Sequence, residues 1–228
     1  MSALYLYAVL RQEPRGALGH GLGDEPLRVV RCGTLVAVAG PVDKAPPIDA
    51  ASLRGHDHTL RRLADLVDAV LPVRFCTVVD DEDALAELLA PRSAELGEAL
   101  ELVAGREQMT LRLYGERPLA DTDPPRPAAA AGGPGTRYLT ERLGQERRLD
   151  ATPGVVALRR ALATLVVDER VERHDTPPLL ASLYHLVERG TSPRYLAALE
   201  AVKTELGDLV ARPSGPWPPY AFAPGAVA

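Results

Sequence analysis

The fold of the carboxyl half is decided by residues 152–206, TPGVVALRRALATLVVDERVERHDTPPLLASLYHLVERGTSPRYLAALEAVKTEL. Thr152-Pro153 is typical of a helix start with proline at the first helical position, and the apolar residues that follow recur at helical spacing. The pattern then predicts two strands, 166–173 and 179–188, around a Pro-rich turn. Ser192-Pro193 begins a second helix. This stretch therefore predicts helix, strand, strand, helix.

Flanking segments complete the pattern on both sides. Residues 108–114 alternate apolar and polar side chains, as a half-buried strand does, and Gly207 precedes a last short strand at 209–212. The resulting order βαββαβ is the ferredoxin-like arrangement, whose right-handed crossovers place both helices on one face of the sheet. We therefore expect a ferredoxin-like carboxyl-terminal domain over 105–212. The Pro/Ala/Gly-rich residues 116–135 are expected to form a flexible excursion within it, followed by a helix at 136–149.

The amino-terminal half mixes strand and helix patterns. The apolar run 3–10 predicts a central strand, two strands flank Gly33, and a helical stripe follows Gly55. Residues 72–79 predict another strand, and a helix after Asp80 should break at Pro91 and resume as far as Gly105. The fold class is therefore α+β with two domains: 1–104 with a mixed sheet and helices, and the ferredoxin-like one. An extended Pro/aromatic tail, 213–228, ends the chain.

Composition excludes several classes of protein. Of the 228 residues, 46% are hydrophobic and 25% are charged, which is the balance of a globular protein and not of a disordered one. The net charge of −5 disfavours nucleic acid and anionic membrane as partners. No apolar run approaches the roughly 20 residues that span a bilayer, and the amino terminus lacks the basic region of a secretory signal. We expect a cytoplasmic protein without a membrane partner.

Motifs that suggest chemistry have simpler explanations. Gly19-His20-Gly21-Leu22-Gly23 places its third glycine one position too early for a phosphate loop, so a surface loop is favoured. His56 and His58 point to different sides if they lie on one helix. The acidic residues 80–83 fit the capping of a helix start better than a cation site. Cys32 and Cys76 are far apart and form no CxxC motif. We predict no catalytic residue, no cofactor and no metal site, and hence no enzyme.

The rare large aromatics fall within two short segments, 72–77 and 214–222. These segments contain the two phenylalanines and the one tryptophan of the chain. Three prolines stiffen the second segment into an extended ribbon that loses little entropy on docking. The ribbon either packs back on its own domain as a lid that buries Trp217, or presents its aromatics to a partner. The candidate interaction or tail-docking residues are Pro72, Arg74, Phe75, Gly215, Pro216, Trp217, Pro218, Pro219, Tyr220 and Phe222.

Four motifs are spread along the chain: Leu4-Tyr5-Leu6-Tyr7, Leu71-Pro72-Val73-Arg74-Phe75, Tyr184-His185-Leu186-Val187 and, most specific of all, Gly215-Pro216-Trp217-Pro218-Pro219-Tyr220-Ala221-Phe222. With these motifs the chain resembles the gas vesicle proteins of the GvpL/GvpF family over nearly its whole length. Cys76 departs from the glycine expected after the phenylalanine. Gln108-Met109 departs from the aromatic residue expected after the glutamate.

The resemblance implies an accessory or minor structural protein of gas vesicle assembly, built from two α+β domains. A shell subunit with a large apolar face aggregates unless it is escorted, and an adaptor can cover that face before the shell grows. We therefore expect a noncatalytic, vesicle-associated protein that binds the hydrophobic major shell subunit and other accessory gas vesicle proteins during nucleation. The alternative is a ferredoxin-like dimer that binds a small molecule or acts as an enzyme, with its Arg-rich carboxyl half as an anion pocket.

Overall fold

The computed structural model describes residues 3–116, 152–174 and 176–225. The chain divides into two compact units: the first comprises Met1–Gln108 and Pro216–Ala228, and the second comprises Met109–Gly215. Apart from Glu116, the expected excursion at 116–135 lies outside the described residues, and so does the helix expected at 136–149.

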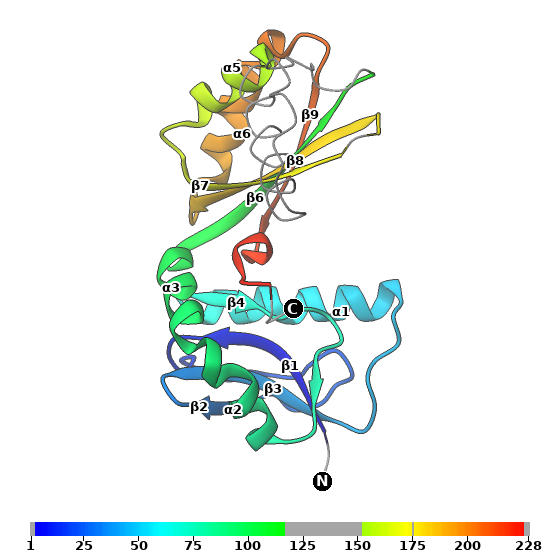
Figure 1. The fold of residues 1–228 in the computed structure, drawn as a ribbon, viewed down its shortest axis with the longest axis vertical. Helices are drawn as coiled ribbons and strands as arrows, with labels where there is room; N and C mark the ends of the chain where they lie inside the picture. The colour runs from blue at the N-terminus through cyan, green and yellow to red at the C-terminus, as the bar shows by residue number, and fades with distance from the viewer. Residues whose placement is uncertain (1–2, 117–151, 175, 226–228) are drawn as a thin grey trace, which may run out of the picture. The chain divides into compact units, whose positions relative to one another are not determined.

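The second unit has the ferredoxin-like strand order. Its sheet runs β7-β8-β6-β9, so the first and third strands of the unit are central and the second and fourth are at the edges (Figure 1). This is the order that the sequence pattern predicts. The elements are β6 (Arg106–Tyr114), α5 (Pro153–Leu162), β7 (Val166–Arg173), β8 (Leu179–Glu188), α6 (Ser192–Ala201), the 3-10 turn η2 (Lys203–Leu206) and β9 (Val210–Trp217).

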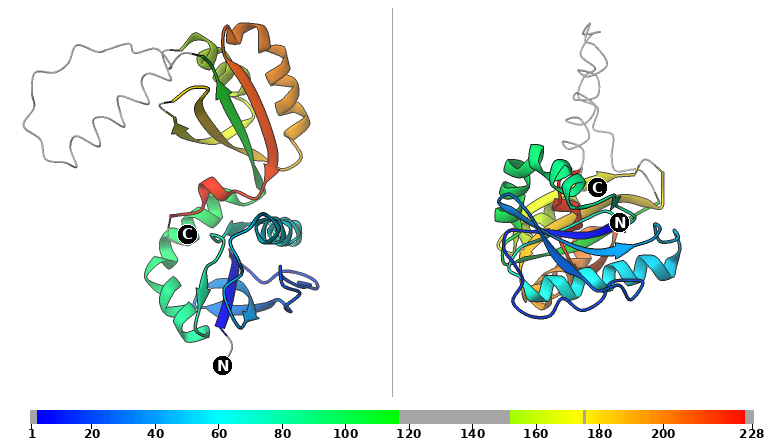
Figure 2. Two further views of the ribbon diagram at one scale, coloured as in Figure 1. Left: turned by 90° about the vertical axis from the view of Figure 1, so that its right-hand side faces the viewer. Right: turned by 90° about the horizontal axis from the view of Figure 1, so that it is seen from below.

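Apolar side chains at alternate positions of the strands form the core of this unit. Met109, Leu111 and Leu113 of β6 all point to one face, where they pack with Leu158 of α5 and Leu199 of α6. Both helices cover this face of the sheet (Figure 2). The two helices therefore lie where two right-handed crossovers would place them.

The last strand is longer than the sequence predicted. β9 continues past Arg212 as far as Trp217, so residues 213–217 of the expected tail belong to a strand. Pro213 and Pro216 lie within it. Proline cannot donate a backbone hydrogen bond, and β9 tolerates two prolines because it lies at the edge of the sheet.

The first unit is built around β1 (Ala3–Leu10). Its sheet runs β2-β3-β1-β4, and β5 also pairs with β1, so the opening strand is central as predicted. All of these pairings are antiparallel. The remaining elements are β2 (Arg28–Cys32), β3 (Leu35–Val42), α1 (Ala50–Leu66), β4 (Val70–Pro72), β5 (Val78–Val79), α2 (Glu82–Leu89), the 3-10 turn η1 (Ala90–Arg92), α3 (Ser93–Val103) and the 3-10 turn η3 (Tyr220–Phe222).

Two sequence predictions for this unit were wrong. Helix α1 begins at Ala50, before Gly55, because the Asp49 side chain caps it by accepting from the Ser52 amide at 2.8 Å. The strand expected over 72–79 is interrupted between β4 and β5 by a turn in which Cys76 has φ 70°. The break at Pro91 is confirmed. No helix in the described ranges is long and apolar enough to cross a membrane.

Candidate functional site

Within the first unit, the end of the second aromatic segment lies against the strand that leads into the first. The 3-10 turn η3 (Tyr220–Phe222) lies against β4 (Val70–Pro72), although the two are far apart in the sequence (Figure 1). We call residues 216–225 the docked segment. We call Asp57 and Arg61 of α1, together with Gln108, the docking site.

Arg61 holds the start of the docked segment. Its guanidinium carbon lies 4.2 Å from the centroid of the Trp217 ring, and its Nη1 donates to the Pro216 carbonyl at 3.2 Å. Its Nε donates to Asp57 at 2.7 Å, which fixes the guanidinium on the surface of α1. A cation over an aromatic face is stabilised by the ring quadrupole. Trp217 is therefore half-buried against a charged group and is not part of an apolar core.

The end of the docked segment is anchored by polar and apolar contacts. The Tyr220 hydroxyl donates to Asp57 Oδ1 at 2.9 Å, and the Ala221 amide donates to Gln108 Oε1 at 2.8 Å. Phe222 is 1% exposed. Pro218 and Pro219 are also buried. The ribbon from Pro216 onward thus belongs to the unit that contains α1 and β4.

Beneath the turn between β4 and β5, which contains Phe75, lies a buried chain of hydrogen bonds through Tyr5 and His56, which we call the relay. The Tyr5 hydroxyl hydrogen-bonds His56 Nδ1 at 2.9 Å and accepts from the Cys76 amide at 3.2 Å. His56 Nε2 lies 3.0 Å from the Val73 carbonyl, which can only accept, so Nε2 carries a proton; in the neutral ring Nδ1 then accepts from the Tyr5 hydroxyl. Burial lowers the pKa of His56, and its bond to Val73 only partly offsets that effect. Burial also raises the pKa of Tyr5.

Aromatic rings surround this relay. The Phe75 ring meets the His56 ring edge-on at 5.7 Å between centroids, and Tyr7 stacks on the other side of His56 at 5.5 Å. The Tyr5 and Tyr7 centroids are 4.7 Å apart. Sequence reasoning assigned Phe75 to the site but missed the role of His56. The sequence did contain an indication of this role, because the two tyrosines of the apolar opening strand have hydroxyls that need a hydrogen-bond partner when they are buried.

The glycine-rich loop binds a carboxylate of the protein itself. The Gly23 amide donates to Glu25 Oε2 at 2.8 Å, and the Tyr7 hydroxyl donates to Oε1 of the same residue. The Leu22 amide donates to the Tyr7 hydroxyl at 2.8 Å. A Cβ on Gly21 would lie 1.9 Å from Glu25 Oε1, so the loop needs glycine there to let this side chain in. The close approach of the backbone serves an internal acidic group.

The other predicted site residues lie at the surface. Arg74 is exposed, and its carbonyl accepts from the Thr77 hydroxyl at 2.8 Å. Gly215 is exposed with φ 123°, a backbone conformation that favours glycine. Within the described ranges, no group of three or more histidine, cysteine or acidic side chains is placed to hold a metal.

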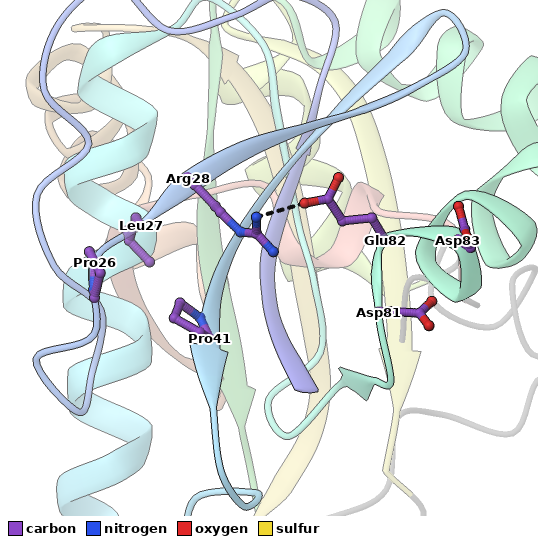
Figure 3. A pocket seen from close by; sticks show the side chains of 7 residues that line it. All are labelled: Pro26, Leu27, Arg28, Pro41, Asp81, Glu82 and Asp83. Atoms are coloured by element: carbon purple, nitrogen blue, oxygen red, sulfur yellow. Dashed lines mark ion pairs between the residues drawn. The ribbon is translucent and has the colours of Figure 1, made fainter. Parts of the chain in front are cut away.

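The acidic residues 80–83 cap a helix, as predicted, and border a groove. Asp81 accepts from the Ala84 amide at 2.8 Å at the start of α2. The groove beside it has a volume of about 690 Å³, and an ion pair of 2.7 Å joins Arg28 to Glu82 across it (Figure 3). Both partners of this pair are half-exposed, which makes it a weak stabiliser. The lining residues are Pro26, Leu27, Arg28, Pro41, Asp81, Glu82 and Asp83.

A charged network ties the helices of the second unit to its sheet. His185 Nδ1 lies 2.6 Å from the Tyr195 hydroxyl, and its Nε2 lies 2.8 Å from Glu169 Oε2. Arg159 donates to Glu169 Oε1 at 2.7 Å. Burial raises the pKa of Glu169, but the bonds from His185 and Arg159 outweigh it, so the pKa is lowered overall. His185 and Tyr195 are fully buried, and the network joins α5 and α6 to β7 and β8.

A pocket of about 740 Å³ also lies in the second unit, beside the start of α5 and η2. Among the described residues, the charged side chains that line it are the carboxylates Glu116, Glu205 and Asp208, which repel an anion. The described groups of this unit with a shifted pKa, Glu169, Tyr184 and Tyr195, do not line it. The arrangement therefore disfavours the anion pocket of the alternative hypothesis.

Comparison with known proteins agrees with this architecture. The family profile "Gas vesicle synthesis protein GvpL/GvpF" matches residues 3–224. Gas vesicle protein L of Streptomyces sp. (strain CB03234) is 34% identical, with 96% of this chain and 92% of the relative covered. Gas vesicle protein F of the same organism is 27% identical, with 96% and 98% covered. Gas vesicle protein L2 of Halobacterium salinarum is 30% identical, with 96% and 91% covered.

Solved structures show the same fold. The crystal structure of GvpF from Microcystis aeruginosa superposes with a TM-score of 0.74 at 16% identity, covering 98% of this chain and 99% of that one. The GvpF structure from Anabaena sp. PCC7120 gives a TM-score of 0.73 at 16% identity, covering 98% and 96%.

Proposed function

We propose that this chain, which belongs to the gas vesicle synthesis protein family GvpL/GvpF, is a noncatalytic adaptor that binds the hydrophobic major shell subunit and other accessory gas vesicle proteins during nucleation. The family profile spans nearly the whole chain, which supports a role in gas vesicle assembly. That match carries the proposal. Location in the cytoplasm and attachment to the vesicle stay predictions, which fractionation of cells with floating vesicles checks.

An apolar patch at the start of α1 offers a surface for such a subunit. Ile48 is 83% exposed and Leu53 is 46% exposed. They occupy the positions directly before the cap Asp49 and four residues after it, where apolar side chains often pack on each other as a staple. Here both side chains remain exposed, and clustered exposed apolar side chains are typical of interaction surfaces. We assign this patch, Ile48 with Leu53, to the shell subunit.

Complementation of vesicle formation tests the proposal. A gas vesicle gene cluster that lacks this chain is supplied with wild type, with Ile48→Asp/Leu53→Asp, or with Val156→Asp. Val156 is a matched control because it is an apolar side chain of similar exposure, 49%, on α5 of the second unit. We expect wild type and the control to restore vesicles in electron micrographs and the double variant to fail at equal abundance. Full restoration by the double variant would show that vesicle formation does not need the patch. Normal vesicles in cells that lack the chain would show that the chain has no role in assembly.

A further inference from the structure

The docked segment belongs to a different unit from the strand that leads into it. The rest of β9 lies in the sheet of the second unit, whereas the chain from Pro216 onward is part of the first unit. Arrangements in which a segment leaves its own unit and docks elsewhere are the ones that proteins exchange between identical copies.

Gly215 lies at this division and has the backbone freedom that a hinge needs. It is the last residue of the second unit, it is exposed, and its φ of 123° lies in the region that favours glycine. A change in the dihedral angles of one glycine redirects the segment that follows. Because Gly215 precedes only the last two residues of β9, its rotation releases Pro216 and Trp217 from the edge strand and leaves the rest of β9 in place.

The contacts of the docked segment do not depend on which copy supplies it. Its hydrogen bonds and cation–π contact run from residues 216, 217, 220 and 221 to Asp57, Arg61 and Gln108 of the docking site. A second copy carries the same segment and can therefore make the same contacts. The two arrangements then differ mainly in effective concentration, which is millimolar for a segment held by a short linker. Exchange is favoured where copies are crowded together.

We propose that the docked segment also binds in trans, so that the residues 216–225 of one copy fill the docking site of a second copy and join the two. Each copy contributes one segment and one docking site. Reciprocal exchange gives a dimer, and sequential exchange gives a longer chain of adaptors.

Mixing two full-length variants tests this proposal. The first, Asp57→Ala/Arg61→Ala, has a damaged docking site and an intact segment. The second, Trp217→Ala/Phe222→Ala, has an intact docking site and a damaged segment. In the mixture, the intact segment of the first has no site of its own to occupy, so it should bind the vacant site of the second. Sedimentation velocity should show a species of twofold mass in the mixture that grows with concentration and is absent from either variant alone.

A matched control replaces the first variant by Arg54→Ala, which removes an exposed arginine of the same helix outside the docking site. Its segment stays on its own docking site, so mixing it with the second variant should give several-fold less of the twofold species. Circular dichroism of each variant checks folding. If either double variant is unfolded, Asp57→Asn replaces the first variant and Trp217→Leu replaces the second. Mixtures that contain no twofold species at any concentration would overturn the proposal.

Discussion

The guanidinium carbon of Arg61 lies 4.2 Å from the centroid of the Trp217 ring, and the same side chain bonds Asp57 and the Pro216 carbonyl. One arginine thus joins α1 to the segment on which the family resemblance chiefly rests. The sequence left two interpretations of Trp217: a ring buried in the core of the protein, or a ring presented to a partner. The structure shows neither arrangement. The ring is half-buried against a cation on a defined docking site.

Replacing Trp217 should cost an intermediate amount of stability. Truncation of a fully buried tryptophan costs about 3–5 kcal/mol, and a cation–π contact at an exposed site is worth about 0.5–1 kcal/mol. For the half-buried ring we expect Trp217→Ala to lower the free energy of unfolding by about 1–3 kcal/mol, measured by urea denaturation. A cycle with Arg61→Ala should give a coupling of about 0.5–1 kcal/mol. Zero coupling would show that the ring and the cation do not stabilise each other.

Replacing Cys76 with glycine should stabilise the protein. Cys76 has φ 70°, which is strained for a residue with a Cβ. Its thiol contacts the Pro46 carbonyl at 3.3 Å, a weak bond that the variant loses. We expect Cys76→Gly to raise the free energy of unfolding by about 0.5–1 kcal/mol, whereas Cys76→Ala should not raise it. Equal stability of the two variants would argue against strain at this turn.

The buried His56 should make stability depend on pH. Its pKa in the folded protein is lowered below the ordinary 6.5, mainly by burial. Between these two pKa values the unfolded chain binds a proton that the folded protein does not. The contribution of His56 is therefore complete above pH 6.5 and is lost as the pH falls through the folded pKa.

Denaturant unfolding at pH 7.5 and at several lower values measures this loss. His56→Gln should be less stable than wild type at pH 7.5, because the relay to Tyr5 and Val73 is disturbed. Its stability should nevertheless fall less steeply below pH 6.5, since it lacks the titrating ring. Parallel pH profiles for the two proteins would contradict the burial of a neutral His56.

Gly154 allows helix α5 to approach η2 closely. A Cβ at this position would lie 2.7 Å from the backbone oxygen of Leu206, a group that cannot turn aside as a flexible side chain can. Alanine is otherwise the better helix residue by roughly 1 kcal/mol. We still expect Gly154→Ala to destabilise by about 1–3 kcal/mol in thermal unfolding. Gly97→Ala in α3 is the control, because no atom lies within 4 Å of a Cβ there. A stabilised Gly154→Ala would show that the close approach does not constrain α5.

The second unit could be predicted closely because its signals are local. Strands 166–173 and 179–188 and the helix start at Ser192 match the structure to the residue, since alternation, a proline turn and a helix-start proline each act over a few residues. The turn at Cys76 was missed because Phe75-Cys76-Thr77-Val78 favours a strand by composition. The glycine that the family resemblance leads one to expect at position 76 was the sequence feature that could have indicated this turn.

Long-range contacts account for what the sequence left open. The pairing of Tyr220 with Asp57, and of Ala221 with Gln108, joins residues far apart in the chain, and no periodic pattern encodes such a contact. The same holds for Arg61, which the helical pattern places on the solvent-exposed face of a helix like many other arginines. The sequence pattern therefore drew attention to residues 214–222 and left their contacts with α1 and Gln108 unpredicted.

Direct binding of the major shell subunit is what an adaptor must show, and pull-down with the full-length tagged chain tests it. We predict that the wild-type chain and Val156→Asp retain the shell subunit through washing at physiological salt, and that Ile48→Asp/Leu53→Asp retains at least tenfold less. Failure of the wild-type chain to retain any shell subunit, with both proteins soluble and folded, would contradict the central claim.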